Sequence, residues 1–467
     1  MDKDIFNFES IKVIIDSLCT CIDLSIQKIK SNYKKENNKD NKIINNLNEE
    51  NYKRYTFEIS FYFSKILSLT LLYLDNIYIL FEPFVSNVYK LIDNRFMIEF
   101  SMDALCAIIP EILLKYEKIK SSINNNINEE NKIWIDEKWQ KMLFSPLLTL
   151  FSQPELFYLL KPKIFKSIEK IIQKGGNYID SYGWDSILQL CMALSNFSIV
   201  NTFLIIKEIL NDYNGYISLF NIFLLMKLLK LFISEENDKN MIFSSIELFW
   251  SCANIIEDYK QEKRKINDSQ KSYFIKTVSI KDDFKLEKYC EDLYIILFSY
   301  LVEINNDSSI ETKKSALNIF TEIFVSKMKS LNKENCLKII NDIFLKAFET
   351  NSDKYIAENK NLELEKILQT SLLCIVKITK EYINDNEKLN ELIYEKYLNK
   401  IVEIIPSGSN LLITDILKSL IEIKISKNSN VPIISTKKDR YFKILSLIDI
   451  YFKGPNFILN KIFRVQT

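Results

Sequence analysis

The sequence predicts an all-α fold, a HEAT/armadillo-like α-solenoid of stacked antiparallel helix pairs. The chain of 467 residues contains 6 glycines and 8 prolines, too few for a protein built of short strands and tight turns. Apolar residues instead recur at three-to-four spacing in one segment after another, as they do in amphipathic helices. Helix pairs follow each other with a period of roughly 40 residues, which is within the range of HEAT and armadillo arrays.

Each expected helix carries a wide apolar stripe and therefore needs a neighbour to cover it. In one of them Leu293, Leu297 and Ile304 fall on the same face. No heptad pattern is sustained, which disfavours a coiled coil. The clearest pairs are expected at 154–174 with 183–197, at 217–233 with 241–262, and at 291–303 with 308–328.

Polar segments rich in Asn, Lys and Glu interrupt this pattern near 32–51, 121–133 and 261–285. They are too poor in apolar residues to pack, so we expect flexible loops within one continuous solenoid over 1–467. Towards the C-terminus, the sequence PSGSN at 406–410 should end a helix.

The stretch GGNYIDSYGWDSILQL holds three of the six glycines, Gly175, Gly176 and Gly183, next to Trp184. A phosphate-binding loop would need a strand followed by Gly-rich spacing and Lys-Ser/Thr, and a dinucleotide site would need GxGxxG. Neither pattern is present. We therefore expect a helix that ends at the glycine pair, a turn, and a second helix whose Trp184 packs between repeats.

Catalytic chemistry has little support in the composition. The chain has no histidine, which excludes Ser/His and Cys/His nucleophile arrangements. Its 8 cysteines form no CxxC pair and are expected to be reduced thiols in the core of an intracellular protein. We expect no catalytic residue, no metal site and no cofactor, and interpret the acidic pairs as solvated side chains: Glu49–Glu50, Glu129–Glu130 and Glu235–Glu236.

Charge and hydropathy limit the partners. A net charge of +1 gives no bulk attraction to nucleic acid or to anionic lipid, so no nucleic-acid partner is expected. No run of about 20 uncharged apolar residues occurs. The nearest segment, Tyr216–Phe232, is interrupted by Lys227 and Lys230 and is expected to be a buried helix. Any action at a membrane would then require recruitment.

The stretch SPLLTLFSQPELFYLLKPKIFKSIEKIIQKGGNYIDSYGWDSILQLCMALS resembles the helical C-terminal region of the large ARF guanine-nucleotide exchange factors. It is more similar to that of their relative, the Mon-two trafficking protein family. In that family an "NPL" helix, a glycine-containing turn and a "GW" that opens the next helix follow one another. The matching positions are Pro146 and Leu147, Gly175 or Gly176, and Gly183 with Trp184.

Further segments extend the resemblance over residues 95–350. Met241–Ile256 resembles the family's "LLWnisD" helix, and Cys290–Phe324 resembles its "LW" segment, with Tyr294 where tryptophan is usual. A further helix, Ser101–Leu113, resembles the preceding "DALt" segment. The residues that carry the family signature, all expected to be structural, are Gly176, Gly183, Trp184, Trp250, Leu293, Leu317 and Phe320.

The resemblance implies a non-catalytic scaffold in Golgi-to-endosome or vacuolar transport, cytoplasmic and peripheral on those membranes. The implied partners are an ARF-like GTPase, a Dopey-type protein or an aminophospholipid flippase. Whether the chain forms an oligomer stays open. The alternative is a soluble HEAT-type nuclear transport receptor of the importin-beta class, although such receptors are usually longer and distinctly acidic.

Overall fold

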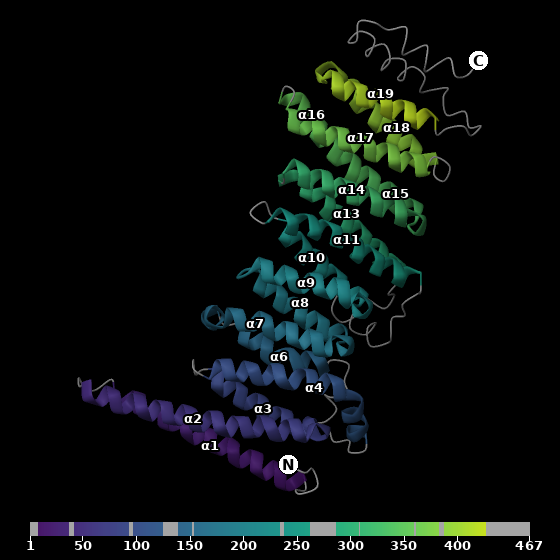
Figure 1. Cartoon of the computed structure of the whole chain (residues 1–467). Helices are drawn as coiled ribbons and strands as arrows, with labels where there is room; N and C mark the ends of the chain where they lie inside the picture. Colours follow the sequence, from purple (N-terminus) through teal and green to yellow (C-terminus); the bar gives the residue numbers. More distant parts are fainter. Residues whose placement is uncertain are drawn as a thin grey trace, which may run out of the picture. The chain divides into compact units, whose positions relative to one another are not determined.

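The computed structural model confirms the predicted fold class, an all-α solenoid of stacked helix pairs (Figure 1). No strand occurs among the residues that the structure describes. These residues are 8–36, 42–92, 97–124, 139–151, 154–233, 238–261, 286–307, 309–358, 361–382 and 387–425.

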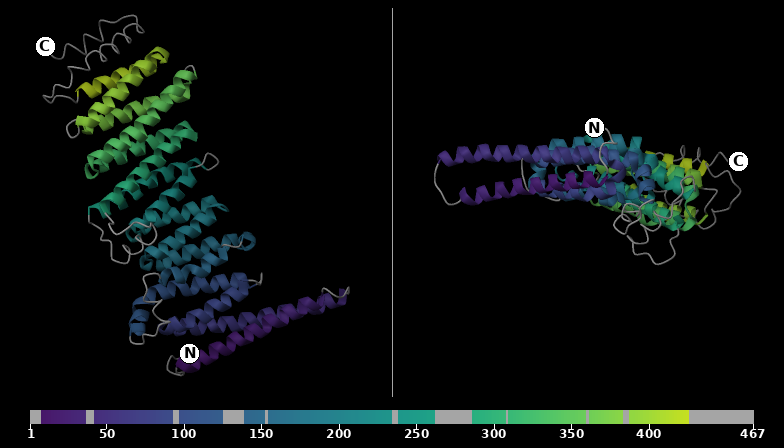
Figure 2. Two further views of the ribbon diagram at one scale, coloured as in Figure 1. Left: turned by 180° about the vertical axis from the view of Figure 1, so that it is seen from behind. Right: turned by 90° about the horizontal axis from the view of Figure 1, so that it is seen from below.

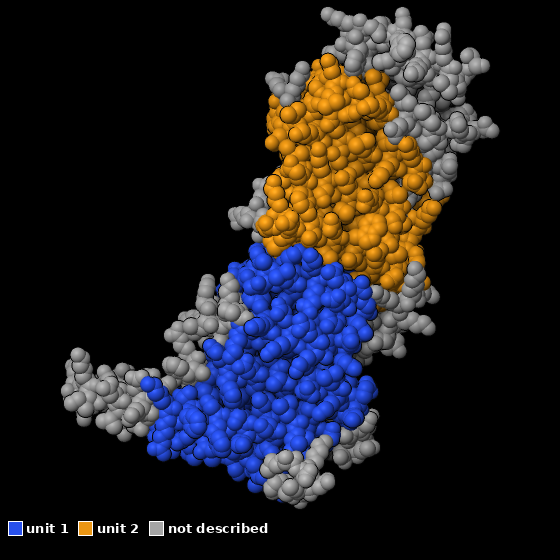
Figure 3. All heavy atoms as spheres, viewed as in Figure 1, with its two compact units in different colours: residues 1–224 blue, residues 225–467 orange. Residues whose placement is uncertain are grey.

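The chain divides into two compact units, residues 1–224 and residues 225–467 (Figure 3). One continuous solenoid over 1–467 stays a prediction. The short helix α10 (Ile222–Phe232) contains the boundary.

The first unit begins with a long antiparallel pair, α1 and α2, which lie side by side (Figures 1 and 2). Beyond them the helices form two layers. One layer contains α4, α7 and α9, and the other contains α3, α6 and α8, with α3 packed on α4 and α8 on α9. The helices are α1 (Phe8–Glu36), α2 (Lys42–Leu72), α3 (Ile77–Ile92), α4 (Ile98–Asn124), α6 (Trp139–Phe151), α7 (Pro154–Gly175), α8 (Ser181–Ser195) and α9 (Ile199–Asp212).

The second unit has the same two-layer plan. One layer contains α11, α14, α17 and α19, in that order. The other contains α13, then a helix made of α15, a π-helical segment and α16, and then α18. The helices are α11 (Lys239–Lys260), α13 (Leu286–Asp307), α14 (Ile310–Lys327), α15 (Lys333–Lys338), the π segment η7 (Ile339–Leu345), α16 (Lys346–Ala357), α17 (Leu362–Tyr382), α18 (Glu387–Ile404) and α19 (Asn410–Ile425).

Aromatic side chains join the two layers of the second unit. The ring of Phe298 from α13 lies 4.8 Å from that of Phe320 on α14, in an edge-on arrangement. Phe320 in turn stacks on Phe344 of the π segment, with ring centroids 5.2 Å apart. Phe298 and Phe320 are fully buried. Edge-on and offset contacts are the favourable geometries for such rings, so this cluster stabilises the packing beyond the area it buries.

The predicted helix pairs are present, with two corrections. The helix expected over 217–233 begins only at Ile222, because Ser218 is extended and caps a short turn with Asn221. The loop expected over 32–51 is largely helical, since α1 runs to Glu36 and α2 begins at Lys42. Lys and Glu are good helix formers, and a helix continues readily from a segment that is already packed.

The predicted break at PSGSN is confirmed: α18 ends at Ile404 and α19 begins at Asn410. The other predicted interruptions, 121–133 and 261–285, fall mostly outside the described residues. The acidic pairs Glu129–Glu130 and Glu235–Glu236 also lie outside them, whereas Glu49–Glu50 belongs to α2.

None of the helices in the described ranges is by itself long and apolar enough to cross a membrane. Within the described part of the chain, one pair of segments, Lys53–Leu72 with Leu74–Leu91, has the combined length and composition of a span, and the two are bent by 89°.

Candidate functional site

The turn between α7 and α8 gathers three of the signature residues. Helix α7 ends at Gly175, and Asp180 caps α8 by accepting hydrogen bonds from the backbone N–H groups of Tyr182 and Gly183, both at 2.9 Å. Gln140 of α6 fixes the turn from outside. Its Nε2 donates to the Tyr178 carbonyl at 2.8 Å, and its Oε1 accepts from the Asp180 N–H at 2.9 Å.

Glycine is required in this turn because other groups approach the backbone closely. A Cβ added at Gly176 would overlap the ring of Tyr213. A Cβ added at Gly183 would overlap Gln140 Oε1 and would lie 2.7 Å from Ile179 Cγ2. The glycines therefore serve helix packing, and the predicted helix-to-helix turn is present.

The two signature tryptophans differ in their surroundings. Trp184 is fully buried in the core of the first unit, with its ring 6.0 Å from that of Tyr213 beyond α9. Its Nε1–H is buried and has no hydrogen-bond partner within the described part of the chain. Trp250 on α11 is only half-buried, so its indole retains contact with solvent.

The remaining signature residues, Leu293, Leu317 and Phe320, are buried at the contact between α13 and α14. Next to them Tyr294 occupies the position where the resembled family usually has tryptophan. The Tyr294 hydroxyl donates to Glu257 Oε2 at 2.9 Å and lies 3.1 Å from the carbonyl of Ala253. The Tyr294 hydroxyl is therefore a polar group held inside the core by acceptors on α11.

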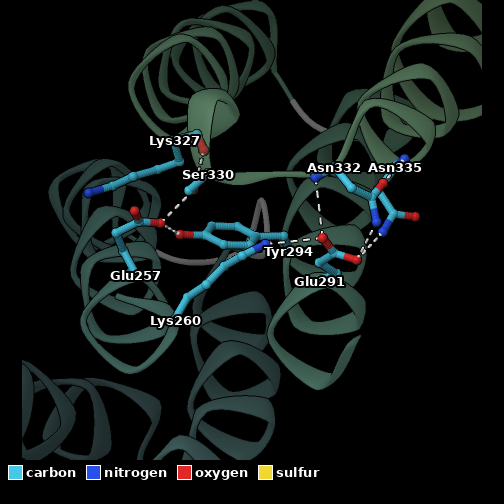
Figure 4. A network of polar contacts seen from close by, with 8 residues as sticks. All are labelled: Glu257, Lys260, Glu291, Tyr294, Lys327, Ser330, Asn332 and Asn335. Atoms are coloured by element: carbon cyan, nitrogen blue, oxygen red, sulfur yellow. Dashed lines mark hydrogen bonds and ion pairs between the residues drawn. The ribbon is translucent and has the colours of Figure 1, made fainter. Parts of the chain in front are cut away.

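Tyr294 belongs to a network of polar side chains that the sequence did not predict (Figure 4). Ser330 donates to Glu257 Oε2 at 2.7 Å, and Gln261 Nε2 donates to the other Glu257 oxygen. The network thus ties α11 to α13 and to the segment that follows α14. Glu257 is 6% exposed.

The second half of the network is a buried ion pair. Lys260 Nζ lies 3.0 Å from Glu291 Oε1, and the two side chains are 8% and 6% exposed. Glu291 also accepts hydrogen bonds from the Asn332 N–H at 3.2 Å, from Asn332 Nδ2 at 2.7 Å and from Asn335 Nδ2 at 2.6 Å (Figure 4). Both carboxylates are therefore neutralised or hydrogen-bonded by the chain itself, as a buried charge requires.

The electrostatics of the network suit a structural junction. Burial is the main cause that raises the pKa of the Tyr294 hydroxyl, and the nearby Glu257 charge adds to it. Burial also raises the pKa of Cys290 and of Cys336, each to about 12. The hydroxyl and both thiols therefore stay protonated at neutral pH, a state in which a thiol is a poor nucleophile.

The eight cysteines are all free thiols. Six of them are buried, as predicted for the core, whereas Cys19 and Cys21 are only half-buried. Burial raises the pKa of Cys191 and of Cys252 to about 12. In the described ranges, no group of three or more Cys, Asp or Glu side chains is placed to hold a metal ion.

One signal for the network was present in the sequence. On α11 the buried positions Phe249 and Ala253 continue at three-to-four spacing to Glu257 and Lys260. Charged residues in register with an apolar stripe indicate buried partners. The partners themselves, on α13 and before α15, could not be found from spacing, because they meet α11 only in the folded stack.

No protein-family model matches the chain, and neither does any curated protein sequence. Among solved structures, the chain is similar to one described as a circular tandem repeat protein with novel repeat topology and enhanced subunit contact surfaces. The two are 11% identical, the match covers 98% of this chain and 99% of that chain, and the TM-score is 0.31.

Proposed function

We propose that the chain is a non-catalytic scaffold that works through protein–protein contacts in membrane traffic between the Golgi and endosomes or the vacuole. The observation that supports the proposal is the layered stack. In each layer, neighbouring helices bury one side and expose a row of side chains on the other, and stacked rows of this kind form the binding surfaces of repeat proteins.

The second unit illustrates such rows. On α17 the exposed side chains Lys366, Leu373 and Lys377 follow at helical spacing between buried positions. Leu373 is 65% exposed. On the adjacent helix α14, the exposed row contains Glu311 and Glu322. Acidic and basic rows side by side suit recognition of a partner by local charge and shape, which agrees with a net charge of +1.

The compartment and the partners come from the resemblance over 95–350 to the Mon-two trafficking protein family. It supports a peripheral position on Golgi or endosomal membranes. The candidate partners are an ARF-like GTPase, a Dopey-type protein and an aminophospholipid flippase.

The test is the location of the tagged protein in its own cells, imaged against Golgi, endosomal and nuclear-pore markers, together with membrane flotation. We expect Golgi or endosomal puncta that float with membranes, and capture of an ARF-like GTPase in its GTP-bound form. A nuclear-rim signal without flotation would contradict the proposal and favour the importin-beta-class alternative, which binding of GTP-loaded Ran would then support.

A further inference from the structure

Helix α2 has two faces of different character. Its inner face packs into the first unit through Ile59, Phe63 and Ile66, all fully buried. The ring of Phe63 stacks on Phe84 of α3 at 5.5 Å and meets Phe100 of α4 edge-on at 5.6 Å. These contacts fix the rotation of α2 about its axis, so the residues on its other face point away from α3 and α4.

That outer face carries a regular stripe of exposed residues, Lys53, Phe57, Phe61 and Lys65, each four positions from the next. Phe57 is 74% exposed and Phe61 is 50% exposed. Residues four apart lie on the same side of a helix, so two phenylalanine rings lie between two lysines. Lys65 Nζ is 5.3 Å from the centroid of the Phe61 ring. We call these four residues the α2 stripe.

Negative charge is absent from the α2 stripe. Glu58, which follows Phe57, pairs with Arg54, whose Nε lies 3.2 Å from Glu58 Oε1. Glu49 and Glu50 precede Lys53 on the same helix. On the neighbouring helix α1, Lys28 Nζ lies over the ring of Tyr55 at 5.7 Å. The two charged positions within the α2 stripe are thus both basic, which suits an anionic partner.

A second pair of exposed apolar residues, on α9, lacks lysines at the four-residue spacing that the α2 stripe has. On α9, Val200 and Leu204 are 53% and 51% exposed and also four residues apart. Val200 lies in the first turn of α9, and the position four residues after Leu204 is Glu208. The α9 pair thus has aliphatic side chains and an acidic flank, whereas the α2 stripe has aromatic rings between cations.

We propose that the α2 stripe docks the protein directly on a membrane that contains anionic lipid. The phenylalanine rings would enter the boundary between headgroups and acyl chains, while the lysine stems extend so that their ammonium groups meet lipid phosphates and carboxylates. The proposal rests on the proposed scaffold function only for the compartment, because lipid contact needs no protein partner.

The size of the α2 stripe favours a membrane over a protein. Burying two phenylalanine side chains removes at most about 500 Å² from water, whereas a stable protein interface needs about 800 Å² on each partner. A bilayer surface accommodates a narrow aromatic stripe without a complementary shape. Insertion of a few side chains with nearby cations gives reversible peripheral binding.

The test uses the purified full-length protein and sedimentation with vesicles of phosphatidylcholine, with and without phosphatidylserine. We expect binding that requires phosphatidylserine and weakens with salt, because the cations contribute through screened charge. The double variant Phe57→Ser, Phe61→Ser should lower the affinity by at least about tenfold. The double variant Lys53→Glu, Lys65→Glu should remove the preference for phosphatidylserine.

The matched control is Val200→Ser, Leu204→Ser, which removes an equally spaced exposed apolar pair from α9 and should leave vesicle binding unchanged. Because all these side chains are exposed, the variants should keep the wild-type melting temperature, which separates loss of binding from loss of folding. Equal binding by wild type and the Phe57→Ser, Phe61→Ser variant would overturn the proposal, as would wild-type protein that ignores phosphatidylserine.

The outcomes also separate this proposal from the scaffold function. Golgi puncta without vesicle binding would overturn direct lipid docking and leave the scaffold function standing, since protein partners would then recruit the chain. Vesicle binding that depends on Phe57 and Phe61, combined with a nuclear-rim location, would support the lipid-binding stripe and contradict the scaffold function.

Discussion

At the scale of single residues, the buried indole of Trp184 offers the sharpest test of packing. We expect Trp184→Ala to lower the free energy of unfolding by about 3 kcal/mol or more, because it leaves a cavity in the core. Trp184→Phe should cost less than the alanine variant, since it also removes a buried N–H that lacks a partner. Denaturant titration of both variants measures the difference.

The half-buried Trp250 is the control for that prediction, and Trp250→Ala should cost clearly less than Trp184→Ala. An unchanged melting temperature for Trp184→Ala would mean that this indole lies on the surface, which would reopen it as a binding residue.

A substitution at Gly183 tests why this position is glycine: because neighbouring side chains approach its backbone closely, and not because its backbone conformation requires glycine. We expect Gly183→Ala to destabilise the protein by roughly 1–3 kcal/mol, because the new methyl group meets Gln140 and Ile179. Gly215→Ala is the matched control, since a Cβ at Gly215 meets no atom within 4 Å. That variant should be neutral or slightly stabilising. Thermal melts of both compare them, and equal losses of stability would refute the packing argument.

Asp180 predicts a pH dependence. Burial is the main cause that raises its pKa from the ordinary 3.8 to about 6, against the lowering effect of two backbone N–H donors. A carboxyl group with a raised pKa in the folded state stabilises the protein at low pH, and this contribution is lost as the pH rises through about 6. Asp180→Asn keeps a good helix cap but no longer titrates.

We therefore expect Asp180→Asn to gain stability relative to wild type as the pH rises from about 4 to about 7. Urea denaturation of both proteins at the two pH values measures this difference. The comparison with wild type cancels the other carboxyl groups, and an identical difference at both pH values would contradict the raised pKa.

At the scale of helices, the buried ion pair of Lys260 and Glu291 joins α11 to α13, and Glu291 also binds the start of α15. Glu291→Ala should cost about 3–5 kcal/mol, because it leaves the Lys260 ammonium buried without its partner. The double variant Lys260→Met, Glu291→Met should lose less stability than the sum of the losses in Lys260→Met and Glu291→Met alone. The reason is that the double variant leaves neither charge buried without a partner. A double-mutant cycle by denaturant titration gives the coupling energy, and strictly additive losses would mean that the pair is not coupled.

The sequence predicted helices well where the local signals agree and poorly where packing decides. Gly175 and Gly183 marked the α7–α8 turn because a glycine stop signal and the apolar stripe of the next helix lie within one short stretch. The π segment Ile339–Leu345 could not be predicted. Its buried pairs, Ile339–Ile340 and Phe344–Leu345, repeat five residues apart, a spacing that satisfies the core only after the helix has widened by a residue.

The candidate sites divide in the same way. The burial of Trp184, Leu293 and Phe320 could be expected from the sequence, because these residues lie in apolar stripes at helical spacing. Glu291 could not be linked to Lys260, since the 30 residues between these positions carry no periodic signal that specifies which helices meet. The α2 stripe can be recognised in the sequence only when it is known that Phe63 faces the core.

At the scale of the whole molecule, the division into two compact units predicts that substitutions in different units change the stability independently. Trp184 lies in the first unit and Glu291 in the second. In stacked repeats each element contacts its neighbours, so a perturbation stays local. We expect the destabilisation by Trp184→Ala and that by Glu291→Ala to add within about 0.5 kcal/mol. Denaturant titration of the double variant tests this, and a larger deviation would show that the two sites are energetically coupled.

The six buried thiols can report which helices of the stack open locally. Cys106, Cys191, Cys252, Cys290, Cys336 and Cys374 belong to six different helices, and burial raises the pKa of each thiol. A thiol that is buried and protonated reacts with an alkylating reagent only after its surroundings open. Mass spectrometry of partly alkylated protein would therefore rank the six helices by the frequency with which each one loosens, without any engineered label.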